Sequence, residues 1–127
     1  MNIRLSRWLA YAGGVAAPLG ETVRRWSTWH DNPSQLFDDY LIGALLIYGA
    51  WRAGRGAGAH SRRFLVAAWG FACGMAYASF FGQLYANRMG VRDPAPISGE
   101  WVAVIKGVAF ALAILSLVGS LRRDPAD

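Results

Sequence analysis

Long apolar runs alternate with short polar segments along the chain, and three of these runs have the length of a membrane-spanning helix. The clearest is residues 64–86, "FLVAAWGFACGMAYASFFGQLYA", which contain no charged residue. As a helix this run is about 34 Å long, enough to cross a hydrocarbon core of about 30 Å. Residues 101–121 form a second run, interrupted only by Lys106, and residues 34–53 form a third. The pattern predicts three clear transmembrane helices.

The N-terminal segment, at about residues 3–29, has a different pattern. Its apolar residues recur at steps of three and four with polar residues on the opposite side, which predicts an amphipathic helix bent at Pro18. Two placements of this helix remain open. It lies in the membrane interface, or it crosses as a short fourth span through residues 8–20, "WLAYAGGVAAPLG".

Together these elements predict an all-α fold: a small polytopic membrane protein with three transmembrane helices and an N-terminal amphipathic or short fourth membrane helix. We expect a single membrane domain over residues 1–127, with a polar tail at 122–127. Hydrophobic residues make up 54% of the chain and charged residues 17%, against roughly 25% charged residues in soluble domains. A chain of 127 residues is too short to surround several such helices with a polar shell.

The basic residues are distributed unevenly and predict the orientation in the membrane. The loop at 52–63, "RAGRGAGAHSRR", carries four Arg and no acid, whereas the two Arg of residues 87–100 are balanced by Asp93 and Glu100. By the positive-inside rule the first loop and the C-terminus are cytoplasmic, and the bias favours a crossing first helix with the N-terminus cytoplasmic as well. The preference for Arg over Lys is typical of a GC-rich bacterial genome, so we expect a bacterial inner membrane.

A repeat of small residues marks one face of the second clear span. Gly70, Gly74, Ala78 and Gly82 follow one another every four residues. Small residues let two helix backbones approach closely in lipid, so this stripe predicts a helix-packing face. The favoured interpretation is packing within the protein's own bundle, and the alternative is a contact between copies in a homo-oligomer.

Lys106 lies on a small and polar face of the last span. That face follows steps of three and four and consists of Lys106, Ala109, Ala113, Ser116 and Ser120. Such a face belongs against protein, which predicts that Lys106 points into the bundle. The alternative is that its ammonium group reaches the nearby outer interface.

Two adjacent acids, Asp38 and Asp39, begin the span at 34–53. Neighbouring residues of a helix point about 100° apart, so the two carboxylates do not share one partner face. Asp39 lines up with Gly43 and Ala50, a face suited to helix contact, and we predict that it points inward. Asp38 is interpreted as an interfacial, cap-like acid.

Gln83 lies at the same predicted depth as Asp39 and Lys106. The sequence therefore predicts an intramembrane polar cluster of Asp39, Gln83 and Lys106, with Asp38 at its edge. A carboxylate and an ammonium group held among helices form either a static clamp, which we favour, or a proton or cation relay.

Other chemistry is not expected from this sequence. The single Cys73 excludes an intramolecular disulfide, and His30 and His60 fall in predicted loops on opposite sides of the membrane, so they cannot share a haem or metal. No nucleophile–base pair or phosphate-binding glycine loop is present. No basic stripe with stacking aromatics lies outside the apolar runs. We therefore expect no metal, cofactor, nucleic acid or enzymatic activity.

The function favoured by these patterns is association between membrane helices. The protein is predicted to act as an accessory subunit of a membrane complex or as a homo-oligomer, with lipid and membrane protein subunits, or other copies of itself, as partners. The first alternative is a small transporter or channel with a polar path through Asp39, Gln83 and Lys106. The second is a membrane enzyme subunit that binds lipid or a quinone among its aromatic side chains.

Overall fold

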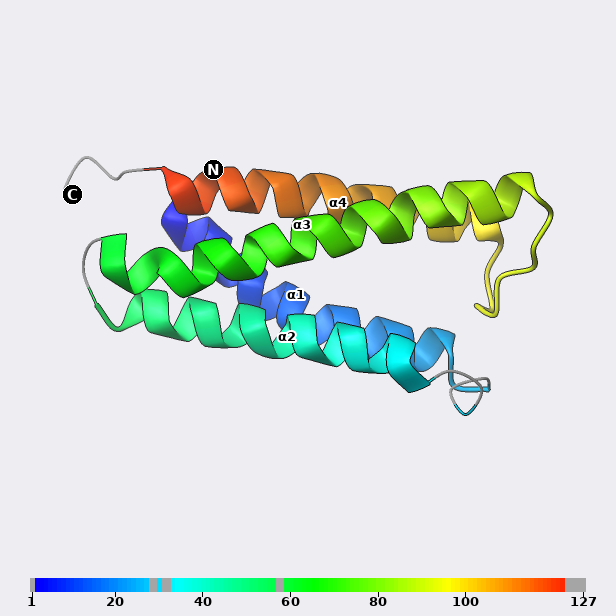
Figure 1. Ribbon diagram of the computed structural model, residues 1–127, viewed down its shortest axis with the longest axis horizontal. Helices are drawn as coiled ribbons and strands as arrows, with labels where there is room; N and C mark the ends of the chain where they lie inside the picture. The colour runs from blue at the N-terminus through cyan, green and yellow to red at the C-terminus, as the bar shows by residue number, and fades with distance from the viewer. Residues whose placement is uncertain (1, 28–29, 31–32, 57–58, 123–127) are drawn as a thin grey trace.

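The described residues of the protein form a bundle of four α-helices that run alternately up and down, as the computed structural model shows (Figure 1). The structure describes residues 2–27, 30, 33–56 and 59–122, and the predicted polar tail from residue 123 lies outside these residues. The helices are α1 (Ile3–Arg24), α2 (Pro33–Gly54), α3 (Ala59–Arg88) and α4 (Gly99–Leu121). The described residues contain no strand, so the all-α prediction is confirmed.

The helix bounds differ from the predicted ones at α1 and α3. α1 ends at Arg24 rather than near residue 29, and α3 begins at Ala59 rather than at residue 64. His60 is therefore in the first turn of α3, and its predicted place in a loop is wrong. Arg62 and Arg63 end the apolar run but do not end the helix, because Arg has a high helix propensity.

Among the residues that the structure describes, two helices, not three, are long and apolar enough to cross a membrane. These are α3, from His60 onward, and α4. The prediction of three clear transmembrane helices is wrong in this respect because α2, although 22 residues long, carries Asp38, Asp39 and Arg52 within its apolar sequence. These charges lower its hydropathy below that of a typical span.

The apolar faces of α3 and α4 point away from the bundle. Only 22% of the most apolar stretch of α3 and 28% of that of α4 are buried. On α4 the side chains of Val104, Ile105 and Val108 are each more than half exposed. A core helix of a soluble protein is mostly buried, so burial within this chain does not account for the apolar composition of these two helices.

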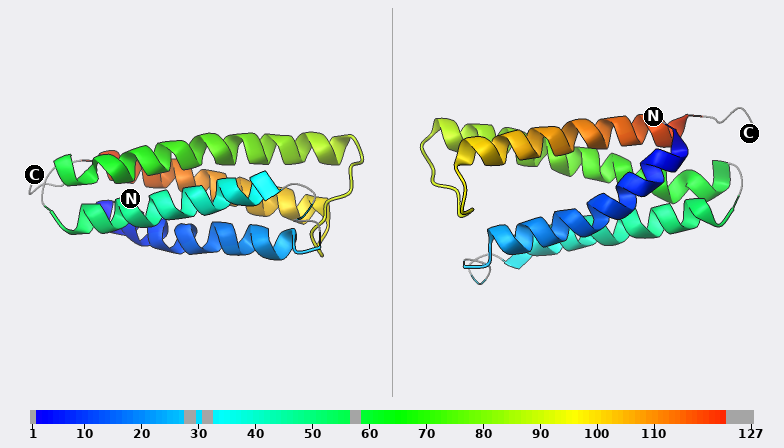
Figure 2. Two further views of the ribbon diagram at one scale, coloured as in Figure 1. Left: turned by 60° about the horizontal axis from the view of Figure 1, so that its bottom comes forward. Right: turned by 180° about the vertical axis from the view of Figure 1, so that it is seen from behind.

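α1 runs obliquely along the bundle, from the end of α4 to the beginning of α2 (Figure 2). Hydrogen bonds join its first turns to α3 and α4. The Ser6 hydroxyl donates to the carbonyl oxygen of Ser116 at 2.9 Å, and the Trp69 indole N–H donates to the Ser6 carbonyl at 3.3 Å. α1 is thus a full member of the bundle rather than a separate arm.

α1 and α2 come closest where two glycines face each other. A Cβ atom on Gly43 would lie 2.5 Å from the carbonyl oxygen of Gly14, so the two backbones touch. That carbonyl lacks its usual helical donor because Pro18, four residues later, has no N–H group. The α1–α2 contact therefore depends on the absence of a side chain at residue 43.

The core is narrow and consists largely of small side chains. Leu65 is fully buried, and a Cβ on Gly49 of α2 would lie 2.8 Å from the Leu65 Cα of α3. The buried apolar residues of this cluster are Ala10, Ile42, Leu46, Ala50, Leu65, Ala68, Trp69, Ala72 and Ala113. Close backbone contact through Gly and Ala is typical of helix packing in membranes.

Candidate functional site

A polar network joins α1, α3 and α4 at the end of the bundle that holds the α3–α4 loop. Its centre is Gln83 of α3, which is 5% exposed. The Gln83 Oε1 atom accepts hydrogen bonds from Lys106 Nζ of α4 at 3.1 Å and from Arg24 Nη2 of α1 at 3.4 Å. One neutral amide oxygen thus holds two cationic side chains from two different helices.

The Gln83 side chain also connects to the beginning of α4 through Asn87. Gln83 Nε2 donates to Asn87 Oδ1 at 3.0 Å, and Asn87 Nδ2 donates to the Gly99 carbonyl oxygen at 2.9 Å. A Cβ on Gly99 would lie 2.5 Å from Asn87 Oδ1, so the side chain of Asn87 occupies the space beside this glycine. The polar residues of α3 therefore fix the position at which α4 begins.

An ion pair closes the network from the loop between α3 and α4. Arg24 donates to both carboxylate oxygens of Asp93, at 2.7 Å from Nη2 and 3.1 Å from Nε. The Asp93 side chain is only 3% exposed and also accepts the backbone N–H of Ala95 at 2.9 Å. Burial acts to raise the pKa of Asp93, but the hydrogen bonds from Arg24 and Ala95 together hold this pKa below its ordinary value.

Glu21 links two arginines at the end of α1. Its carboxylate accepts from Arg24 Nη1 at 2.9 Å and from Arg25 Nε at 2.9 Å. Arg24 thus contacts Glu21, Asp93 and Gln83 at once. The charges at this end are largely balanced within the protein, which is the arrangement of a static clamp.

The predicted cluster is assembled only in part. The structure brings Gln83 and Lys106 into a hydrogen bond, and Lys106 is partly buried between helices rather than extended to the surface. Asp39 is partly buried and Asp38 is exposed. Within the described part of the chain, the Asp39 carboxylate forms neither a hydrogen bond nor an ion pair, so the structure does not join it directly to Lys106.

Four members of the network were not singled out in the sequence. These are Glu21, Arg24, Asn87 and Asp93. Glu21 and Arg24 are three residues apart, a spacing that already predicts a local ion pair. The contact of Arg24 with Asp93, 69 positions away, leaves no signal of this kind.

The small-residue stripe of α3 lies outside the bundle's own packing. Gly70, Gly74, Ala78 and Gly82 are all exposed, and a Cβ placed on any of the three glycines would meet no described atom within 4 Å beyond the nearby backbone of α3 itself. The favoured interpretation, close packing within the bundle, is therefore wrong. α3 packs through its other faces, where Leu65, Ala68, Trp69 and Ala72 are buried.

An aromatic cluster lies between α3 and α4 near this stripe. The Tyr77 and Phe81 rings of α3 are 4.8 Å apart, and each also lies close to Phe110 of α4, at 5.9 Å and 6.5 Å. Such ring contacts stabilise the α3–α4 pair beyond simple burial. These contacts fix α3 against α4 while the stripe itself stays uncovered.

Comparison of this chain with protein families, with functionally characterised proteins and with solved structures finds no match. The described residues also include no group of three or more His, Cys, Asp or Glu side chains placed to hold a metal ion.

Proposed function

We propose that this chain is a small integral membrane protein of the bacterial inner membrane that acts by helix–helix association, as an accessory subunit or a homo-oligomer. Two long helices whose apolar faces point outward support insertion into lipid. α1 and α2 complete the bundle, and each is 22 residues or about 33 Å long, the length of a span.

The observation that carries the associative role is the open stripe of α3. A Cβ atom added to Gly70, Gly74 or Gly82 would meet no atom of the described residues within 4 Å beyond the nearby backbone of α3, and Ala78 continues the same row. In lipid a helix with such a row offers its backbone to another helix, and van der Waals packing then drives association. Since α1, α2 and α4 leave this row uncovered, we assign it to a helix from outside the chain.

The proposed orientation follows from the distribution of Arg residues. Residues 52–63, at the turn from α2 to α3, carry four Arg, and the beginning of α1 and the end of α4 lie near this same end of the bundle (Figure 1). The positive-inside rule assigns that end to the cytoplasm. The clamp formed by Arg24, Gln83 and Asp93 then lies on the outer side.

Cysteine cross-linking in native membranes tests the contact. The native cysteine is first removed by Cys73→Ser. Gly74→Cys and Ala78→Cys are then each introduced singly and oxidised in membrane vesicles. Val108→Cys, at an exposed position of α4, is the matched control. A homo-oligomer gives disulfide-linked dimers at Gly74 or Ala78 and not at Val108.

An accessory subunit gives a different result in the same series. An accessory subunit forms no cross-linked dimer. Instead, a specific membrane protein co-purifies with it in mild detergent. Gly74→Leu should abolish this co-purification, and Val108→Leu should not. If neither a dimer nor a stripe-dependent partner is found, the associative role of α3 is wrong.

A second candidate function, a small transporter or channel, is favoured by one observation. Asp39 has a partly buried carboxylate with no hydrogen-bond or ion-pair partner among the described residues, and its helix α2 packs against α1 and α3, which carry Arg24 and Gln83. Such a carboxylate is suited to binding a proton or a cation. The test is proton or Na⁺ flux into liposomes, in which Asp39→Asn abolishes flux and the exposed Asp38→Asn does not. Absence of flux in the unaltered protein excludes this function for these ions.

A further inference from the structure

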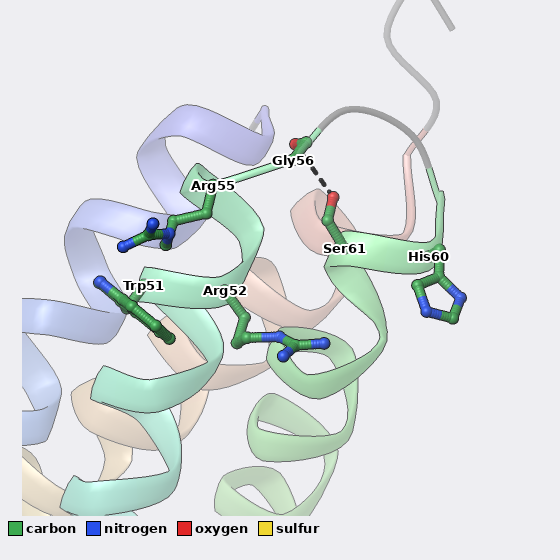
Figure 3. Close-up of a pocket in the computed structure, with 6 residues that line it drawn as sticks. All are labelled: Trp51, Arg52, Arg55, Gly56, His60 and Ser61. Carbon is green, nitrogen blue, oxygen red and sulfur yellow. Dashed lines mark hydrogen bonds between the residues drawn. The ribbon is translucent and has the colours of Figure 1, made fainter.

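A shallow pocket of about 300 Å³ lies at the turn between α2 and α3, at the opposite end of the bundle from the clamp (Figure 3). Basic and aromatic residues from the end of α2 and the beginning of α3 surround it. The lining residues are Trp51, Arg52, Arg55, Gly56, His60 and Ser61. No part of the associative role proposed above uses this pocket.

The pocket is cationic and has no acid of its own. Residues 52–63 contain four Arg and neither Asp nor Glu. The guanidinium groups of Arg52 and Arg55 form no ion pair and no hydrogen bond among the described residues, whereas that of Arg24 at the other end contacts two carboxylates. The donor groups of both guanidinium ions therefore remain available to an anion.

Aromatic rings hold these two arginines in place. The Arg52 guanidinium carbon lies 5.1 Å from the centre of the Phe64 ring and 5.9 Å from that of Tyr48, and Arg55 lies 4.8 Å from the centre of the Trp51 ring. In Figure 3 the side chain of Arg52 extends from α2 toward α3, while Arg55 lies beside Trp51. A guanidinium group positioned over a ring keeps its in-plane N–H donors, the edge that binds phosphate oxygens in pairs.

The surroundings of the pocket favour a lipid over a soluble anion. Tyr48, Trp51 and Phe64, whose rings lie below the arginines, are between 42% and 47% exposed on the outer surface of the bundle. Phe64 begins the uncharged run of α3, so these rings mark the level at which hydrocarbon meets headgroups. An acyl chain running down this surface would bury the apolar rings that a free phosphate leaves exposed.

We propose that this pocket binds the phosphate group of an anionic phospholipid, with Arg52 and Arg55 as the phosphate ligands and the exposed aromatic rings as the contact for its acyl chains. Basic pockets at the cytoplasmic ends of membrane helices suit such headgroups. The inference rests on the membrane insertion proposed above but not on the contact through α3. Alkaline carbonate extraction of membranes tests insertion separately.

Native mass spectrometry of the full chain in detergent measures the binding. The protein is titrated with dioleoylphosphatidylglycerol and, separately, with dioleoylphosphatidylcholine. Both lipids carry a phosphate, but phosphatidylcholine also carries a choline cation that opposes binding beside two arginines, so we expect a preference of about tenfold or more for phosphatidylglycerol. The double variant Arg52→Gln/Arg55→Gln is expected to lose most of the preference.

A charge-matched variant and a competing anion make the test specific. Arg88→Gln/Arg92→Gln removes the same charge from exposed positions at the other end of the bundle and should keep the preference. Inorganic phosphate should not displace the lipid at equal concentration. The proposal is overturned if both double variants lose the preference equally, if neither does, or if inorganic phosphate competes as well as phosphatidylglycerol.

Discussion

Arg24 at the end of α1 and Asp93 in the α3–α4 loop form a two-bond ion pair, with Nη2 2.7 Å from Oδ2 and Nε 3.1 Å from Oδ1. The pair connects the first helix of the chain to the loop before the last one. Because Asp93 is only 3% exposed, its charge depends on Arg24 for compensation. This relationship makes the clamp sensitive to changes at a single residue.

We expect Arg24→Gln to destabilise the fold by about 2–4 kcal/mol, because it leaves the buried Asp93 carboxylate without its cation. Arg25→Gln, which breaks only the more exposed pair with Glu21, should lower stability by less than about 1 kcal/mol. Unfolding by SDS in mixed micelles, followed by tryptophan fluorescence, measures both. Equal losses in the two variants would show that the Asp93 pair contributes nothing special.

The free energy of unfolding should depend on pH through the ionisation of Asp93. The folded pKa of this group lies below its ordinary value of 3.8, so its ionised form stabilises the fold above that pH. The contribution is lost as the pH falls from about 4 through the lower folded pKa. The measurement is the unfolding midpoint in detergent between pH 6 and the lowest pH at which the protein stays dispersed. Asp93→Asn should flatten this profile, whereas Glu100→Gln, at an exposed position, should leave it unchanged.

Glycines at two places on the bundle should respond oppositely to alanine. Gly43→Ala places a methyl group against the Gly14 carbonyl and should destabilise the fold by about 1–3 kcal/mol. Gly82→Ala meets no atom within 4 Å and should be neutral or stabilising by up to about 1 kcal/mol, because Ala has the higher helix propensity. Thermal unfolding in monodisperse detergent micelles compares them. A stable Gly43→Ala would contradict the close α1–α2 contact.

Gln83 should contribute more to stability than its cationic neighbour Lys106 does. Gln83→Leu removes the partner of Arg24, Lys106 and Asn87 at one step, and we expect a loss of about 2–3 kcal/mol. Lys106→Met leaves Gln83 bonded to Arg24 and Asn87 and should be milder, near 1 kcal/mol or less. The same SDS titration ranks the two variants, and the reverse order would refute the central position of Gln83.

Local patterns predicted the helices well because helix formation depends on interactions between residues that are close in the sequence. Hydrophobic periodicity located all four helices, and face analysis indicated that Asp39 is more buried than Asp38. The number of clear spans was overestimated because α2 is apolar in pattern but charged in content. At α3, charged residues near an apolar run were mistaken for the helix boundary.

The sequence by itself determined that this chain forms apolar helices and where each lies, since those properties depend on residues within a few turns of one another. Only the tertiary structure decided that Arg24 meets Asp93, that Gln83 rather than Asp39 receives Lys106, and that the glycine stripe of α3 points outward. A helical period defines the faces of a helix but not which neighbour covers each face. That choice depends on how all four helices pack at once, and here it left the α3 stripe uncovered.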